Sequence, residues 1–269
     1  MKKTKIIAVM LLAVIFCMLG VTGAYADDSN NDVKVFVSIS TSEGKLVLTQ
    51  ERITVSDVDN DGKLTINDAL YLAHEAKYVG GAAQGYASAD TQYGKSLTKL
   101  WGEENMGALG YYLNNASPMS LADEIKDGDY INAFAYTDTT TWSDVYSYFD
   151  VLRAGVLRGA TVELVLSYQS YDENWNAVAL PVAGAKITIN GEETSYVTDE
   201  NGKCSVVIDE KSVAVISAHS DELNIVPPVC VVEIVKAPGS CGWVWYAVAG
   251  AVCLAIVAVA VVLVKKKNK

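Results

Sequence analysis

Residues 57–68 read Asp-Val-Asp-Asn-Asp-Gly-Lys-Leu-Thr-Ile-Asn-Asp. Acidic side chains stand at positions 1, 3, 5 and 12 of this stretch, and glycine stands at position 6. A Ca²⁺ ion needs six to eight oxygen ligands at about 2.3–2.6 Å, and few short segments supply them all. The spacing therefore predicts a calcium-binding loop of twelve residues.

Each position of this predicted loop has a defined part. The first three acidic residues present alternate carboxylates to one ion, and Gly62 permits the turn beneath it. Position 7 offers its backbone carbonyl, position 9 acts through a water, and position 12 returns from the first turn of a helix. The alternative is a metal-free polar turn, in which four carboxylates repel one another without a cation. The expected metal ligands are Asp57, Asp59, Asp61, Lys63, Thr65 and Asp68.

Aspartate at position 12, preceded by Leu-Thr-Ile-Asn, makes this EF-hand-like loop resemble the calcium repeats of dockerin domains. The resemblance implies Ca²⁺ as the cofactor. Dockerins that bind a cohesin partner usually carry two repeats, whereas this chain has one, so cohesin binding is not expected. The flanking residues predict a strand over 51–55 and, after the loop, a helix that ends at Gly80-Gly81. Its apolar positions are Ile66, Ala69, Leu70, Ala73 and Ala76.

The N-terminal residues 1–26 read as a signal peptide. Three lysines precede an apolar run from Ile6 to Leu19, and Ala24-Tyr25-Ala26 is a small-x-small cleavage site. The mature chain is expected to begin at Asp27. An uncleaved N-terminal anchor is the alternative.

The C-terminal residues predict a membrane anchor. Residues 243–264 are 22 uncharged positions, enough for a helix to cross a hydrocarbon core of about 30 Å. The basic tail 265–269 follows at once, which places it in the cytoplasm. The linker 237–242 contains no Leu-Pro-x-Thr-Gly motif for wall attachment. We therefore expect a single-pass type I protein of the cell membrane, with the lipid bilayer as one partner and its ectodomain outside the cell.

The ectodomain is strongly acidic. All 32 Asp and Glu lie outside the signal and the tail, whereas seven of the 21 Lys and Arg lie within them. The ectodomain charge is therefore −18, from 14 basic against 32 acidic residues. Such a surface argues against nucleic acid as a partner. Three cysteines remain outside, and their spacing leaves open both a Cys204–Cys230 disulfide and simple burial of the thiols.

The composition predicts a mainly β chain with one or two short helices, the second over 121–125, and the length suits two modules. In the first, residues 27–150, strands are expected over 97–101, 110–114 and 130–136. The segments Leu-Trp-Gly (100–102), Gly-Tyr-Tyr-Leu-Asn-Asn (110–115) and Lys-Asp-Gly-Asp-Tyr-Ile (126–131) resemble the transcobalamin C-terminal-like family of bacterial surface proteins. The resemblance implies a β-grasp-related α+β fold, here carrying the calcium loop.

The second module, residues 151–236, reads as strands joined by tight turns. Strands are expected over 161–168, 185–189, 206–208, 213–217 and 229–235, with turns at Asn190-Gly191 and Asn201-Gly202. The segments 181–189 and 198–203 resemble bacterial Ig-like repeats of the collagen-adhesin B or carboxypeptidase-regulatory type. The resemblance implies a β-sandwich, a fold that often lifts another domain off the membrane.

No catalytic set is visible in the sequence, so we expect no enzyme. His74 and His219 are isolated, and His74 is expected at the surface or at its boundary. Tyrosines and Trp142 either line a ligand face or pack on strands: Tyr86, Tyr93, Tyr111, Tyr112, Tyr146 and Tyr148. The leading hypothesis is a non-catalytic, membrane-anchored surface protein with a structural calcium loop and a binding or adhesion role toward a small molecule, glycan or protein. The alternative is capture of a small ligand such as a corrinoid for a transporter.

Overall fold

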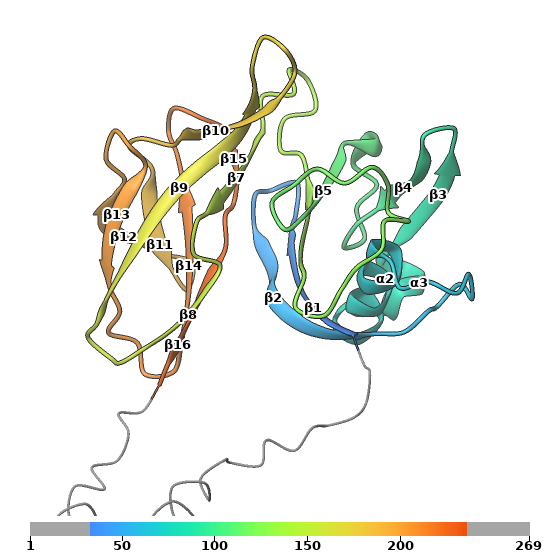
Figure 1. The fold of residues 1–269 in the computed structure, drawn as a ribbon, viewed down its shortest axis with the longest axis horizontal. Coiled ribbons are helices and arrows are strands. Elements are labelled where there is room, and N and C mark those ends of the chain that lie inside the picture. The colour runs from blue at the N-terminus through green and yellow to red at the C-terminus, as the bar shows by residue number, and fades with distance from the viewer. Residues whose placement is uncertain (1–32, 236–269) are drawn as a thin grey trace, which may run out of the picture. The chain divides into compact units, whose positions relative to one another are not determined.

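The computed structural model describes residues 33–235. Within this range the chain is mainly β, with 16 strands, two α-helices and one short 3-10 helix (Figure 1). The expectation of a mainly β chain is thereby confirmed. The predicted signal peptide, linker, membrane span and basic tail lie outside the described residues.

The N-terminal lobe, residues 33–136, is built on a four-stranded mixed sheet in the order β2-β1-β6-β5. β1 pairs antiparallel with β2 and parallel with β6, and β5 pairs antiparallel with β6. A two-stranded sheet, β3-β4, completes the lobe. The strands are β1 (Val33–Ser40), β2 (Leu46–Val55), β3 (Ala87–Thr91), β4 (Gly94–Lys99), β5 (Leu109–Leu113) and β6 (Tyr130–Ala135).

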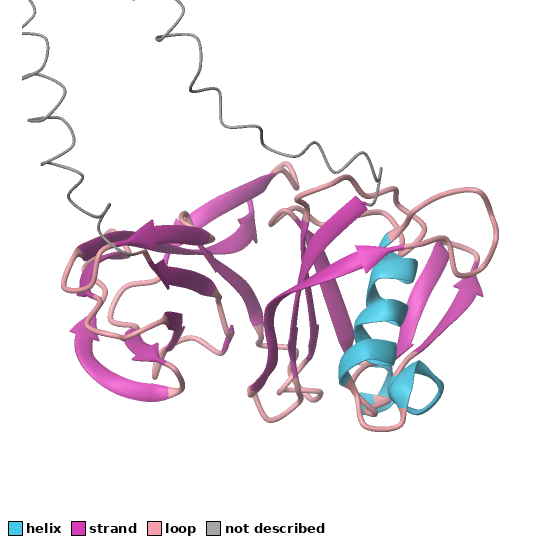
Figure 2. Ribbon diagram, turned by 90° about the horizontal axis from the view of Figure 1, so that it is seen from below, coloured by secondary structure: helices cyan, strands magenta, loops and turns pink. Residues whose placement is uncertain are grey.

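Helix α2 (Ile66–Lys77) covers one face of the four-stranded sheet (Figure 2). Alternate residues of β1 point toward it, so Val35, Val37 and Ile39 are fully buried against the helix stripe. The predicted stripe is buried from Ile66 to Ala73, whereas Ala76 is exposed.

The segment after α2 differs from the sequence-based expectation. The helix ends at Lys77, and Gly80, at φ +97°, precedes a second short helix, α3 (Gly81–Gly85). Glycine adopts this φ without the Cβ clash that other residues meet, so the two glycines redirect the chain and do not simply stop it. The second helix lies here and not at 121–125, where the structure has a turn and an isolated β-bridge. The short 3-10 helix η1 spans Asn105–Gly107.

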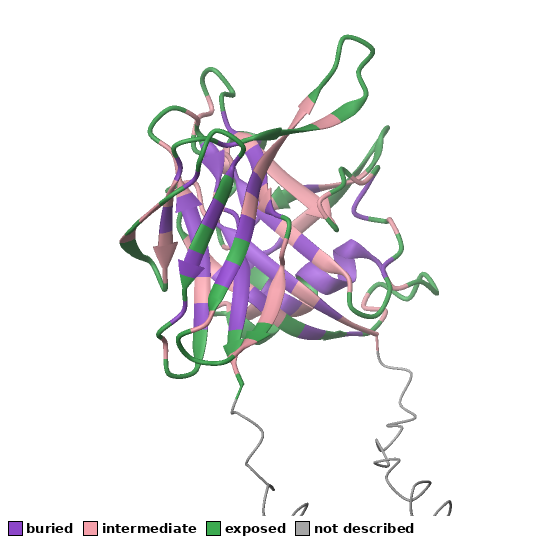
Figure 3. Ribbon diagram, turned by 60° about the vertical axis from the view of Figure 1, so that its left-hand side comes forward, coloured by how far each residue is buried: buried purple, intermediate pink, exposed green. Residues whose placement is uncertain are grey.

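The C-terminal lobe, residues 145–235, contains two sheets with a common apolar cluster. One has the order β10-β9-β7-β15, with β13 also pairing to β9, and the other has the order β12-β11-β14-β16-β8. Figure 3 shows the buried and exposed residues that alternate along these strands. The strands are β7 (Val145–Phe149), β8 (Arg153–Val156), β9 (Thr161–Tyr171), β10 (Ala177–Pro181), β11 (Lys186–Ile189), β12 (Glu192–Val197), β13 (Lys203–Val207), β14 (Val213–His219), β15 (Ile225–Val226) and β16 (Cys230–Ile234).

Two features of this lobe bear on the predicted organisation. The turn Asn190-Gly191 joins β11 to β12 with φ +53° and +84°, as a tight hairpin requires. Strand β7 lies before the predicted module boundary at residue 150 but pairs with β9. A third apolar cluster, centred on Phe134, Tyr146 and Val226, contains residues from both lobes.

Candidate functional site

The predicted calcium loop connects the end of β2 to the start of α2. Two of its residues have positive φ, Asn60 at +59° and Gly62 at +84°. Asparagine and glycine adopt this conformation more readily than other residues, so the loop can reverse twice in a short distance. The loop residues from 59 to 63 are exposed, whereas the helix that follows is anchored in the core.

Three aspartates of the loop converge. One carboxylate oxygen from each of Asp57, Asp59 and Asp61 lies within 4.8 Å of the others. Asp57 fixes the curl, because its Oδ1 accepts a hydrogen bond from the Asp61 N–H at 3.2 Å and its Oδ2 accepts one from the Gly62 N–H at 2.8 Å. Three negative charges this close favour a cation between them.

A protein cation already lies beside this group. Lys95 Nζ, from β4, is 3.3 Å from Asp59 Oδ2 and 4.0 Å from an oxygen of Asp90. Asn67 Nδ2 also approaches Asp59 Oδ2, at 3.4 Å. Sequence reasoning missed Lys95, since it follows Asp59 by 36 positions and no local pattern connects them.

Asp68 has a different environment from the three converging aspartates. It is fully buried, and its Oδ2 accepts hydrogen bonds from the Thr65 N–H at 2.8 Å and the Thr65 hydroxyl at 2.6 Å. Its Oδ1 accepts from the Val58 N–H at 3.0 Å. Thr65 and Asp68 thus form a capping box at the start of α2. The structure therefore brings together three of the predicted ligands, Asp57, Asp59 and Asp61. It places Thr65 and Asp68 at the helix cap, where the hydrogen bond from Val58 to Asp68 holds the end of the loop to its beginning.

The Lys63 side chain points away from the aspartates. Its Nζ forms an ion pair with Glu124 at 2.8 Å, and this partner raises the pKa of Lys63. The prediction that position 7 offers only its carbonyl is compatible with this geometry. Both side chains are more than half exposed, so the ion pair contributes little to stability.

The donor set fits a hard divalent cation such as Ca²⁺. It consists of carboxylate oxygens in an exposed loop, with backbone and hydroxyl oxygens close by in sequence. A carboxylate oxygen that accepts one hydrogen bond still has a lone pair for a metal, so the contacts of Asp57 do not exclude coordination. A donor set of this composition can bind a cation.

The expectation that His74 lies at the surface or at its boundary is wrong. His74 is 0% exposed, its Nδ1–H donates to the Leu70 carbonyl at 2.6 Å, and its Nε2 accepts from the Trp101 N–H at 3.0 Å. Burial lowers its pKa. These contacts select the neutral ring, which joins α2 to the segment after β4.

The predicted aromatic residues divide into packed and exposed ones. Tyr86 and Tyr146 are buried, whereas Tyr93 is 82% and Trp142 is 55% exposed. The rings of Tyr112 and Tyr146 stack at 3.7 Å between centroids, and burial raises the pKa of Tyr112 to about 12. Tyr86, Tyr112 and Tyr146 are therefore packing residues, whereas Tyr93 and Trp142 are presented to solvent.

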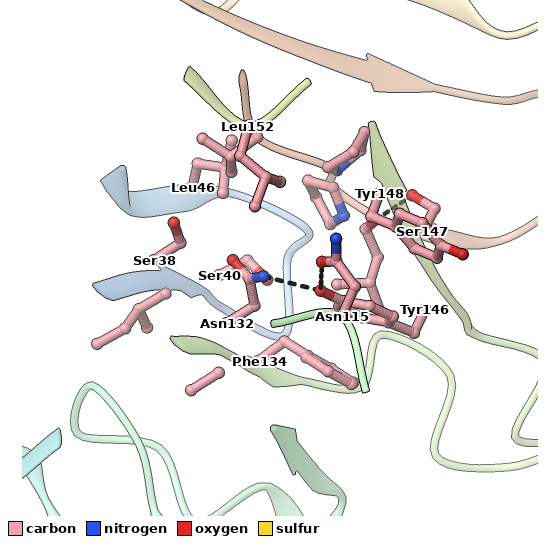
Figure 4. Close-up of a pocket in the computed structure, with 16 residues that line it drawn as sticks. Ser38, Ser40, Leu46, Asn115, Asn132, Phe134, Tyr146, Ser147, Tyr148 and Leu152 are labelled. Carbon is pink, nitrogen blue, oxygen red and sulfur yellow. Dashed lines mark hydrogen bonds between the residues drawn. The ribbon is translucent and has the colours of Figure 1, made fainter. Parts of the chain in front are cut away.

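Tyr146 lines a small cavity between the β1–β6 region and β7 (Figure 4). Its hydroxyl accepts a hydrogen bond from Asn132 Nδ2 at 2.7 Å and donates one to Asn115 Oδ1 at 2.8 Å. The free volume is about 10 Å³, room for one water at most. This cavity lies where the two lobes meet and is too small to hold a ligand.

Cys204 and Cys230 are both buried and free. The alternative of a disulfide between them therefore does not hold in this structure. Burial raises the pKa of Cys230 to about 12, so its thiol stays protonated at neutral pH.

Within residues 33–235, no helix combines the length and the apolar character that a membrane span requires. The predicted span lies beyond this range. No protein family and no curated protein matches the chain in sequence.

Proposed function

We propose that this chain is a non-catalytic, membrane-anchored cell-surface protein whose loop 57–68 holds a structural Ca²⁺ ion. The observation that carries the proposal is the convergence of the Asp57, Asp59 and Asp61 carboxylates within 4.8 Å in an exposed loop. The bound ion neutralises their repulsion and holds the link between β2 and α2.

We infer a β-grasp-like module for residues 27–150 and an Ig-like β-sandwich for 151–236. The mixed sheet with α2 on one face supports the first, and two sheets around one apolar cluster support the second. The predicted signal 1–26, span 243–264 and basic tail support export and anchoring as a type I protein.

Calcium is about millimolar outside cells, where loops of this kind bind with dissociation constants of about 10⁻⁴–10⁻³ M. Binding to the folded state alone then stabilises it by ~0.4–1.4 kcal/mol. For a chain of this size, that corresponds to a rise in melting temperature of about 1–5 °C. The ion thus raises the stability of the N-terminal lobe after export.

Thermal unfolding of the full-length chain in detergent, with 1 mM calcium or with chelator, tests this proposal. We expect the wild type to melt about 1–5 °C higher in calcium and Asp59→Ala to lose that difference. Asp90→Ala is the matched control, because Asp90 also faces Lys95 but lies outside the converging group. Equal melting temperatures of the wild type in both buffers would refute the calcium site.

Capture of a small ligand such as a corrinoid is the second candidate. One observation favours it, a groove of about 880 Å³ beside the β1–β2 turn and strands β11 and β14. This volume suits a small molecule, and threonine, serine and asparagine residues supply polar contacts. Equilibrium dialysis of the full-length chain against cyanocobalamin decides the matter, since equal concentrations on both sides would exclude this candidate.

A further inference from the structure

A second groove, of about 500 Å³, lies on the sheet face of β7, β9 and β10. We call it the aromatic groove and define it by Asn115, Ser117, Tyr148, Gln169, Tyr171 and Trp175. The remaining lining residues are alanines and one valine, and none of the lining residues is charged. It shares no residue with the calcium loop.

Strand register explains why this face is open. Tyr148 stands opposite Ser167, and Gln169 and Tyr171 follow on the same face at steps of two. Their partners on β10 are Ala179 and Ala177. Since alanine is small, Ala177 and Ala179 leave a shelf beside Gln169 and Tyr171, and the Tyr171 side chain is 51% exposed there. The other face of β9 belongs to the core of the C-terminal lobe.

Trp175 lies at the end of this shelf, in a strained backbone conformation and with its side chain exposed. It is 84% exposed and has φ +62°, a conformation that bulky residues rarely adopt. Asp172 holds the hairpin tip, because its Oδ1 accepts the N–H groups of Asn174 and Asn176, both at 2.8 Å. Tyr171 packs beside the indole at 6.5 Å between centroids. Backbone strain is concentrated at functional sites, so the exposed indole is a candidate ligand contact.

The groove also holds unused hydrogen-bonding capacity. Gln169 Oε1 is buried and has no hydrogen-bond partner among the described residues. Asn115 uses its Oδ1 for the Tyr146 hydroxyl, and its Nδ2 makes no hydrogen bond to the described part of the chain. A buried acceptor without a donor costs free energy, and a ligand O–H group recovers it once the Gln169 side chain turns its Oε1 into the groove.

We infer that the aromatic groove binds a neutral oligosaccharide. A pyranose ring has an apolar C–H face that stacks on Trp175 and Tyr171, and hydroxyls at its edge that bond to Gln169 and Asn115. The uncharged lining and the acidic surface disfavour anionic glycans. This inference specifies the ligand of the proposed surface-binding role and rests on that role, but not on calcium.

A proline-rich peptide is the main competing ligand, because such peptides also dock in aromatic grooves. Proline has no N–H group, so a peptide of this kind supplies few donors to the orphaned Gln169 oxygen. The groove therefore fits a polyhydroxylated ligand better.

The test titrates the full-length chain, in a detergent without a sugar headgroup, with a panel of neutral tetrasaccharides. The panel contains β-glucan, chitin and galactan fragments, with sialyllactose and a decaproline peptide as comparisons, and binding is read by calorimetry. We expect at least one neutral fragment to bind below about 10 mM, and Trp175→Ala to weaken it about tenfold or more. Gln169→Leu should weaken it as well, since it removes the acceptor.

Tyr93→Ala is the matched control, because Tyr93 is equally exposed at another hairpin tip, between β3 and β4. The affinity of this variant for the neutral fragment should equal that of the wild type. Absence of binding to the whole neutral panel, unchanged affinity in Trp175→Ala, or binding of the charged sugar or the peptide alone would each overturn the inference. Melting temperatures with and without calcium, taken on the same samples, report separately on the proposed calcium site.

Discussion

His74 shows how one buried titratable residue makes folding sensitive to pH. Both ring nitrogens are committed in the neutral form, one donating to Leu70 and one accepting from Trp101. Protonation places a second N–H against the Trp101 N–H and adds a charge to a fully buried site.

The folded-state pKa of His74 is lowered by burial, so the unfolded state binds its proton first as pH falls. The free energy of unfolding should therefore decrease as pH falls through about 6.5 and stop responding below the folded pKa. Urea unfolding of wild type and His74→Gln between pH 7.5 and 5 measures this, and the variant should show a smaller slope. A slope in His74→Gln equal to that of the wild type contradicts the assignment.

At the scale of elements, the start of α2 is fixed by two independent devices. Thr65 and Asp68 cap each other's backbone groups. The next free N–H groups, of Ile66 and Asn67, donate to the carbonyls of Asp123 at 3.1 Å and Leu121 at 2.9 Å. The turn at 121–125 thus satisfies helix donors that would otherwise be buried without partners.

Thr65→Ala removes the side-chain cap and should lower the free energy of unfolding by ~0.5–2 kcal/mol. Thr65→Ser keeps the hydroxyl and should recover most of that loss. Urea unfolding in chelator isolates the cap from any calcium effect at the same residue. Equal stabilities of the Ala and Ser variants would show that the hydroxyl does not stabilise the helix.

At the scale of the molecule, aromatic rings and amides join the two lobes. Tyr146 of β7 stacks on Tyr112 of β5, and its hydroxyl bridges Asn115 and Asn132. Gln50 Nε2 adds hydrogen bonds to the carbonyls of Leu152 at 2.8 Å and Val229 at 3.1 Å. Because these contacts join the two lobes, we expect the lobes to unfold together.

Tyr146→Phe should lower the free energy of unfolding by ~1–3 kcal/mol, because it leaves the two asparagine amides without their buried partner. Chemical denaturation followed by fluorescence and circular dichroism measures the loss. Tyr93→Phe, an exposed control, should be neutral. A Tyr146→Phe variant as stable as the control would show that the hydroxyl bridge contributes nothing.

Local patterns predicted part of this molecule. The spacing of Ile66, Ala69 and Leu70 predicted α2, and Asn190-Gly191 predicted the β11–β12 turn, because both signals act within a few residues. The segment 80–94, rich in glycine, alanine and serine, has the composition of a loop but contains α3 and β3. Its structure depends on packing partners distant in sequence, such as β4, which pairs with β3.

The candidate sites likewise contain residues that local spacing predicts and residues that only the folded chain brings together. The aspartate spacing predicted the convergence of Asp57, Asp59 and Asp61, since the loop itself determines it. The aromatic groove required the register of β9 against β10, which places Ala179 beside Gln169. Burial of His74 and the approach of Lys95 to Asp59 also required tertiary contacts. Sequence alone offers no local signal for these.

Anomalous diffraction from crystals grown with calcium shows whether loop 57–68 holds an ion. One peak is expected about 2.3–2.6 Å from oxygens of Asp57, Asp59 and Asp61. Lys95 Nζ should withdraw from Asp59, because the ion takes over its neutralising role. Absence of a peak at these carboxylates, with Lys95 still paired to Asp59, would refute the calcium site.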